Sequence, residues 1–139
     1  MDKKIKEYIT KNKFLTLATC KDNQPYCANC FYVFDEANQI LIFLSDELTR
    51  HITEAIANKN VAGTINTEVT TVAKIQGIQF SGEFITPTEE EQKIFYNLYY
   101  KNFPFAKAKP SPIWGIALNN IKMTDNTLGF GKKLIWKRR

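Results

Sequence analysis

The sequence predicts a mainly β protein (α+β), with six or seven antiparallel strands and three peripheral helices. Three observations support this. Apolar and polar residues alternate in several short runs, turn-forming residues separate those runs, and apolar residues recur three times at helical spacing. Strands in this number form a small barrel when helices cover its open side. At 139 residues, the chain is expected to form a single domain over residues 1–139.

The first half of the chain is predicted to hold two helices and an antiparallel meander of three strands. Ile5, Tyr8 and Ile9 share one face of the first helix, and polar turn residues at 21–25 and 35–38 separate the strands. The expected elements are a helix at 2–12, strands at 14–20, 26–34 and 39–45, and a helix at 49–58.

The second half is predicted to add strands and one further helix. Thr88 and Glu91 have the spacing of a capping box, which indicates a helix that begins at Thr88. Gly77 and Gly82 fall inside an expected strand, where glycine marks a bend, a bulge or a close backbone approach. The expected strands are at 61–65, 72–85, 113–123 and 134–136.

The positive charge of the chain is concentrated at its two ends. The formal net charge is +5, but ten of the nineteen basic residues lie within residues 1–13 and 132–139. The rest of the chain is slightly acidic, so nucleic-acid binding is an unfavoured interpretation. The most apolar run, residues 40–44, is too short to span a membrane, and no signal sequence is recognisable. A cytoplasmic protein without a membrane partner is therefore expected.

The three cysteines are expected to be reduced. An odd number of cysteines and no secretion signal argue against a disulfide framework. Cys27 and Cys30 form a C-x-x-C pair, but within a strand these positions point to opposite faces. His51 is the only histidine, so four zinc ligands cannot be assembled. Both cysteines are predicted to be small buried core residues, neither bridged nor metal-bound.

A candidate phosphate site lies at the start of the second helix. Arg50 and His51 occupy its first turn, where cations are normally unfavourable because that end of a helix is already positive. Hydroxyl groups at Ser45 and Thr49 accompany them, together with free backbone N–H groups. These features together are typical of a phosphate cradle. In the alternative interpretation, two preceding acidic residues balance the charge and Arg50 faces solvent.

The sequence gives little support for other kinds of phosphate-binding or catalytic site. The segment 127–133 holds Gly129 and Gly131 before two lysines, but its spacing differs from the phosphate-loop motif, and a turn between strands is favoured. With one histidine, a nucleophile–histidine pair is not expected. If the protein is an enzyme, a bound cofactor must therefore supply the chemistry.

Taken in order along the chain, several segments resemble the pyridoxamine-phosphate-oxidase-like FMN-binding split barrels, and in particular the bacterial YhbP-like proteins. The segments that carry this resemblance are 27–32, 49–51, 61–64, 77–80 and 124–133. The resemblance implies a homodimer with FMN in a groove between two subunits. It also implies that Ser45, Thr49, Arg50 and His51 hold the phosphate. Beside the ring it places Ala28, Asn29, Cys30 and Gln79, with Lys133 and Trp136 contributed by the second subunit.

Two departures from this family pattern limit what the resemblance implies. His51 stands where many relatives carry a lysine, which weakens charge pairing with a phosphate at neutral pH. The chain also lacks the arginine and histidine set with which pyridoxamine-phosphate oxidases hold their substrate, so that activity is not expected. The expected function is a flavin-dependent oxidoreductase acting on a small molecule with a nicotinamide electron donor. The alternatives are a flavin- or haem-type binding protein without turnover and, with least support, a basic barrel associated with nucleic acid.

Overall fold

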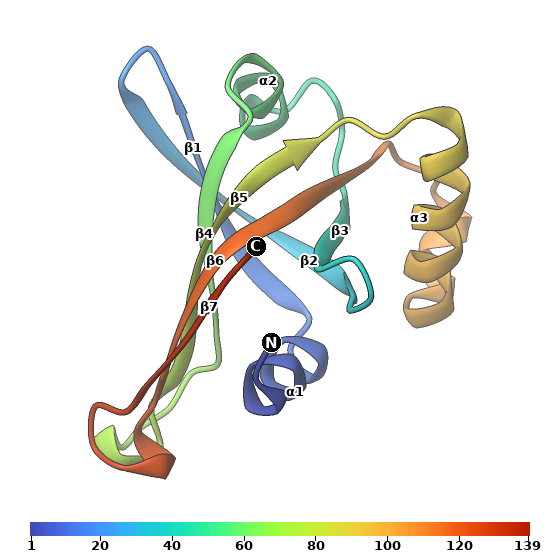
Figure 1. Cartoon of the computed structure of the whole chain (residues 1–139). Helices are drawn as coiled ribbons and strands as arrows, with labels where there is room; N and C mark the ends of the chain where they lie inside the picture. The colour runs from blue at the N-terminus through green and yellow to red at the C-terminus, as the bar shows by residue number, and fades with distance from the viewer.

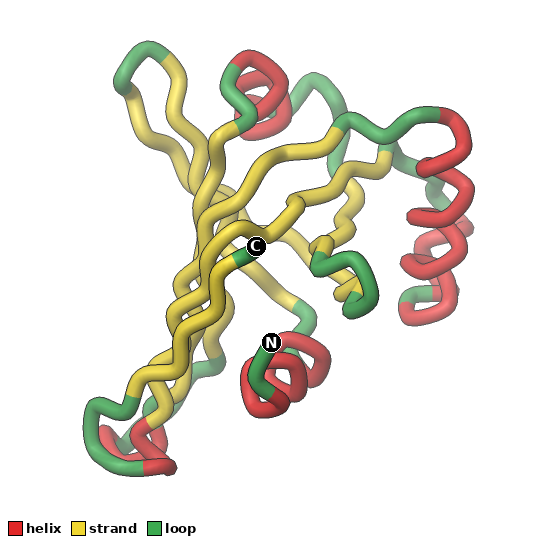
Figure 2. The backbone as a smooth tube through the Cα atoms, viewed as in Figure 1, coloured by secondary structure: helices red, strands yellow, loops and turns green.

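A computed structural model describes residues 1–139 and shows seven strands in one antiparallel sheet, with three α-helices at its periphery (Figure 1). The helices lie outside the strands in every case (Figure 2). The mainly β fold class and the strand number predicted from the sequence are confirmed. The helices are α1 (Lys3–Lys11), α2 (Arg50–Ala57) and α3 (Glu89–Asn102). The strands are β1 (Phe14–Lys21), β2 (Gln24–Asp35), β3 (Ile40–Leu44), β4 (Asn60–Asn66), β5 (Gln76–Ile85), β6 (Ile113–Asp125) and β7 (Lys133–Lys137).

The sheet closes into a barrel through its longest strand. The strand order is β3-β2-β1-β4-β5-β6-β7, and β6 also pairs with β3. The first half of β6 pairs with β3 from Ile113 to Ala117, while its second half pairs with β7. A β-bulge opposite Ser81 and Gly82 separates the two halves, and such an extra residue bends a strand. One strand can therefore serve both the closed barrel and the extension that carries β7.

The hairpin of β1 and β2 turns more tightly than the sequence pattern predicted. The turn consists of Asp22 and Asn23, both at positive φ (51° and 62°), and both strands continue up to it. Aspartate and asparagine tolerate this left-handed conformation, which matches the twist of a two-residue hairpin. The predicted five-residue turn at 21–25 was too long for this reason.

The fifth strand is shorter at its start than predicted. It begins at Gln76, and residues Val72–Lys74 form a 3-10 turn instead of extended strand. The neighbouring strands explain this, because pairing stops at Asn66 of β4 and at Asp125 of β6. Residues 72–75 therefore have no strand on either side to continue the ladder.

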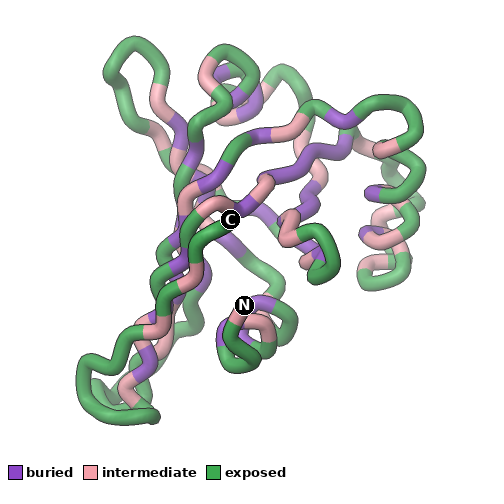
Figure 3. Tube along the Cα trace, viewed as in Figure 1, coloured by how far each residue is buried: buried purple, intermediate pink, exposed green.

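The core is filled from the barrel and from two helices. Ile5, Tyr8 and Ile9 of α1 are buried with Ile52 and Ala55 of α2 in the same apolar cluster as the inward side chains of the strands. The buried segments gather where the strands cross, and the hairpin and loop tips are exposed (Figure 3). The amphipathic face predicted for the first helix is therefore the face that contacts the core. In α2, Ile52 and Ala55 are buried, but Ile56 is exposed.

The third helix covers a separate, smaller cluster. Phe95 and Tyr99 of α3 pack against Val33, Ile42 and Ile113, whose side chains lie on the outer side of β2, β3 and β6. The capping box predicted at Thr88 is confirmed, because its hydroxyl accepts from the backbone N–H three residues on. The outer face of the remaining strands has no helix over it.

The end of the chain is tied to a turn formed early in it. The Arg138 guanidinium donates hydrogen bonds to the backbone carbonyl oxygens of Leu118, Asn38 and Gln39 at 2.7, 3.1 and 3.1 Å. These contacts join the last residues to the bulge region of β6 and to the β2–β3 turn. The seam of the barrel is therefore secured by the C-terminus.

Candidate functional site

The segment between β3 and α2 holds Ser45 in a fixed position. The Ser45 N–H donates to the carbonyl oxygen of Pro112 at 3.1 Å, and the Trp114 indole N–H donates to the Ser45 carbonyl oxygen at 2.9 Å. Asp46 then forms a turn, in which its carboxylate accepts from the Leu48 N–H at 2.8 Å. The backbone on either side of the Ser45 side chain is thus anchored to β6 and to the residue that precedes it.

Three of the predicted phosphate-site residues meet at the start of α2. The Ser45 Oγ and the His51 Nε2 are hydrogen-bonded at 2.7 Å, and the Thr49 Oγ1 lies 3.4 Å from the same nitrogen. Burial lowers the pKa of His51, so its ring is neutral at pH 7. The cluster therefore offers hydrogen-bonding groups rather than a charge.

The N-terminus of α2 has no side-chain cap, unlike those of the other two helices. Asp2 accepts from an N–H of α1 and Thr88 accepts from an N–H of α3. In α2 the Thr49 hydroxyl instead donates to the Asp46 carbonyl oxygen, so no side chain caps the helix. The backbone N–H groups of residues 50–52 have no acceptor within the protein. Such groups, at the positive end of a helix, favour an anion.

The Arg50 side chain points away from this cluster, along α2 toward Glu54. Its Nε donates to the Glu54 Oε2 at 2.7 Å, and its guanidinium lies 4.1 Å from the centre of the Tyr26 ring. Glu54 is buried and also accepts from the Thr19 hydroxyl at 2.9 Å. The hydrogen bond from Arg50 lowers the pKa of Glu54, which keeps this carboxylate ionised. About half of the Arg50 side chain remains exposed, so its Nη atoms are free for another partner.

A row of polar side chains crosses the uncovered outer face of the sheet. Thr16 donates to Asn29 at 2.9 Å across β1 and β2, and the register then places Thr64 beside Thr16 and Gln79 beside Thr64. We call Asn29, Thr16, Thr64 and Gln79 the polar row. Sequence reasoning identified Asn29 and Gln79 but missed the two threonines. The two-residue alternation of β1 and β4 was the signal that could have found them.

The strand alternation separates other residues that were predicted to act together. Asn29 lies on the outer face, while Cys30 is buried inside the barrel and Ala28 is half-buried on that same inner side. On β7, Lys133 is exposed and lies opposite Thr124, whereas the half-buried Trp136 packs against the core. Among the predicted ring contacts, Asn29 and Gln79 therefore share a face with Lys133.

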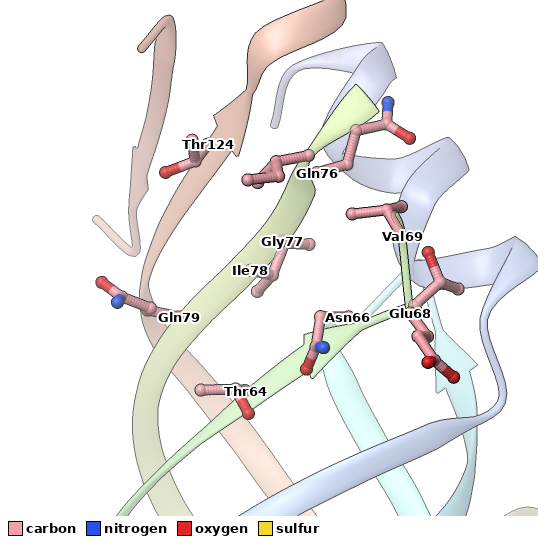
Figure 4. A pocket seen from close by; sticks show the side chains of 11 residues that line it. Thr64, Asn66, Glu68, Val69, Gln76, Gly77, Ile78, Gln79 and Thr124 are labelled. Carbon is pink, nitrogen blue, oxygen red and sulfur yellow. The ribbon is translucent and has the colours of Figure 1, made fainter. Parts of the chain in front are cut away.

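A groove of about 510 Å³ runs along the outer face beside the polar row. Thr64 and Asn66 of β4 line it together with Gly77 and Gln79 of β5 and Thr124 of β6 (Figure 4). The loop that follows β4 forms its remaining wall. A second hollow of about 280 Å³ continues from Gln79 toward β7. Gln79 thus lies where the two hollows meet.

Only one of the two cysteines of the C-x-x-C pair is buried. Cys30 is in the core, where burial raises the pKa of its thiol to about 12, but Cys27 is exposed. The prediction that both are core residues was wrong for Cys27. The opposite faces predicted for the two residues explain the difference, because only one side of β2 at this point faces the barrel interior.

None of the three helices has the length and apolarity that crossing a membrane requires.

Comparison with known sequences finds relatives along nearly the whole chain. A UPF0306 protein from Photorhabdus laumondii is 44% identical over 134 residues, which cover 96% of this chain and 94% of the relative. The UPF0306 protein YhbP from Salmonella arizonae is 41% identical over 134 residues, which cover 96% and 91%. No protein-family model matches the chain.

Several solved structures share the fold at low sequence identity. A heme binding protein from Mycobacterium smegmatis has a TM-score of 0.78 at 13% identity, covering 99% of this chain and 59% of that one. A FAD-binding protein from Mesorhizobium loti has a TM-score of 0.71 at 17% identity, covering 88% and 94%. A NimC/NimA family protein from Clostridium acetobutylicum has a TM-score of 0.71 at 19% identity, covering 98% and 91%.

The resemblance read from the sequence is confirmed by these comparisons at both levels, family and fold. The chain belongs to the UPF0306 family, and its fold is the split barrel of the pyridoxamine-phosphate-oxidase-like proteins.

Proposed function

We propose that the protein binds FMN and acts as a flavin-dependent oxidoreductase on a small molecule. The observation that carries the proposal is the uncapped start of α2, where free N–H groups lie beside the hydrogen-bonded hydroxyls and ring of Ser45, Thr49 and His51. The solved FAD-binding protein with the same fold supports a flavin as the ligand.

The residues at the start of α2 fit a phosphate group. The Ser45 hydroxyl and the helix N–H groups supply hydrogen-bond donors, which phosphate oxygens accept, and the Thr49 hydroxyl would add a third on leaving the Asp46 carbonyl oxygen. The neutral His51 adds no charge, so Arg50 must supply it through the Nη atoms that Glu54 leaves free. When bound, FMN would supply the two-electron redox chemistry of the proposed reaction.

The ring is proposed to lie against the polar row. Asn29 and Gln79 can direct side-chain amides at the polar edge of a flavin, and the short threonines between them let a flat ring approach the sheet. Ala28 and Cys30, on the inner side of β2, would shape this wall from behind. A nicotinamide donor is the proposed source of electrons.

A homodimer is proposed because this groove is open on one side. Ligands of this size typically have about 70–90% of their surface buried, which requires a second wall over the polar row. A second copy of the chain can provide it, with its Lys133 near the ring and its half-buried Trp136 on the inner side of the same strand. Light scattering during size exclusion is expected to show a species of twice 16.0 kDa. A single 16.0 kDa species that binds FMN tightly would contradict the dimer.

A second candidate function is ligand binding without turnover, with haem or flavin as the ligand. It is favoured by the heme binding protein from Mycobacterium smegmatis, which shares the fold at a TM-score of 0.78. Titration with haemin, followed by its absorbance, tests this candidate. Bound flavin that NADH and NADPH do not bleach would favour it over the oxidoreductase.

The phosphate site is tested by titrating the flavin-free protein with FMN and with riboflavin, which lacks the phosphate. Arg50→Ala is expected to weaken FMN binding roughly ten- to a hundredfold, because a charge-assisted contact is lost. Arg139→Ala, at the exposed C-terminus, is the matched control and should leave the dissociation constant unchanged. Equal affinity of the wild-type protein for FMN and riboflavin would refute the phosphate site.

A further inference from the structure

Exposed aromatic side chains continue the outer face beyond the polar row. Phe14 and Phe31 face each other across β1 and β2, one outer position along from the pair Thr16 and Asn29. Their ring centroids are 4.9 Å apart in an edge-to-face arrangement, yet the two residues remain 47% and 57% exposed. Leaving this much phenylalanine surface in water costs free energy that a flat apolar ligand would recover.

A third ring, from the end of α3, extends this surface. The Phe103 ring centroid lies 6.0 Å from that of Phe31 and 5.0 Å from that of the buried Tyr99. We call Phe14, Phe31 and Phe103 the aromatic ledge. Because two of its rings stand on paired strands and Tyr99 supports the third, the ledge is a preformed surface.

An unpaired cation stands over the ledge. The Lys13 Nζ lies 5.6 Å from the centre of the Phe103 ring, and the residue is exposed. The four ion pairs of the protein involve other residues, so no carboxylate neutralises Lys13. A ligand that combines a flat ring with a negative group would match both features.

We propose that the aromatic ledge and Lys13 bind a planar aromatic molecule that carries an anionic substituent. Its ring packs on Phe14 and Phe31, and its carboxylate or phosphate pairs with the Lys13 ammonium. The ledge adjoins Asn29, which lies on the wall expected to face the flavin ring, so this molecule would be the substrate of the oxidoreductase. That identification of the substrate rests on the proposed function. Binding to the ledge itself requires only the contacts described above.

The test measures binding of 2-naphthoate and of its uncharged analogue 2-naphthalenemethanol to the full chain by naphthalene fluorescence. Phe31→Ala is expected to weaken binding of both probes about fivefold, through lost ring packing. Lys13→Gln is expected to weaken 2-naphthoate about threefold and leave the uncharged probe unchanged. Phe130→Ala is the matched control, since Phe130 is 87% exposed on the β6–β7 loop, and should change neither.

The same samples distinguish failure of this proposal from failure of the proposed function. Equal affinity of the wild-type and Phe31→Ala proteins for 2-naphthoate would overturn the ledge, whatever the result with FMN. A wild-type protein that binds 2-naphthoate as expected but does not bind FMN would refute the flavin function and leave the ledge supported. A change of molecular mass in Phe31→Ala, seen by light scattering, would show that a second copy covers the ledge and would also overturn the proposal.

Discussion

Replacing Trp114 with phenylalanine tests how the start of the candidate site is anchored. Trp114 is 6% exposed, and its ring stacks on Phe84 with centroids 5.4 Å apart. A phenylalanine can keep this stack. It cannot replace the indole N–H, which donates to the Ser45 carbonyl oxygen at 2.9 Å. The substitution therefore removes one hydrogen bond and the second ring of the indole.

The expected loss of stability follows from these two contributions. An acceptor that loses its buried donor costs about 1–3 kcal/mol, and the lower end applies because Ser45 is half-buried and water can reach it. Lost packing around the missing ring adds about 1 kcal/mol. Together they lower the free energy of unfolding by about 2 kcal/mol. Because Ser45 becomes less fixed, FMN affinity should fall as well.

Urea unfolding followed by circular dichroism measures the first effect, and Trp136→Phe is the matched control. Trp136 is half-buried and its indole N–H has no hydrogen-bond acceptor in the protein, so about 0.5 kcal/mol or less should be lost there. If the two variants lose the same stability, the hydrogen bond to Ser45 contributes nothing and the anchoring argument fails.

Three further predictions concern single positions. Gly63→Ala should lower the free energy of unfolding in urea by about 3 kcal/mol or more, because a Cβ would overlap the Thr16 carbonyl oxygen and the Phe80 ring. Gly77→Ala, where a Cβ would make only ordinary contacts, should be nearly neutral, and a similar loss of stability in the two variants would contradict this. Because burial lowers the pKa of His51 in the fold, its stabilising effect is complete above about pH 6.5 and is lost as the pH falls. The urea midpoint of the wild-type protein should therefore drop more between pH 7.5 and pH 5 than that of His51→Gln, and parallel drops would refute the assignment. Iodoacetamide at pH 8 should label Cys27 and spare Cys30 in mass spectrometry, because Cys30 is buried with its pKa raised to about 12.

The local elements of this fold could be predicted because their sequence patterns are strong. Leu15, Leu17 and Thr19 alternate with outward residues along β1, and Thr88 with Glu91 defines the start of α3. The closure of the barrel could not be predicted in the same way. It depends on pairing between β3 and the first half of β6, and neither strand's residues specify a partner so distant in the chain.

Of the four residues predicted to hold a phosphate, three lie together in the structure and the fourth points elsewhere. Ser45, Thr49 and His51 do meet, because they flank one short turn. Arg50 points elsewhere, and its four-residue spacing to Glu54 was a signal in the sequence that could have indicated the ion pair. The hydrogen bond from Trp114 to Ser45 joins residues far apart in the chain, so no local pattern could reveal it.

The contacts of Arg138 bear on how firmly the barrel stays closed at its seam. Its guanidinium bonds to carbonyl groups of Asn38 and Gln39, about a hundred residues earlier, and to that of Leu118. Without these bonds, the seam between β3 and β6 would be held by its strand ladder and by core packing alone, and it would open more readily. An opened seam exposes unpaired strand edges, at which strands of neighbouring chains can pair wrongly.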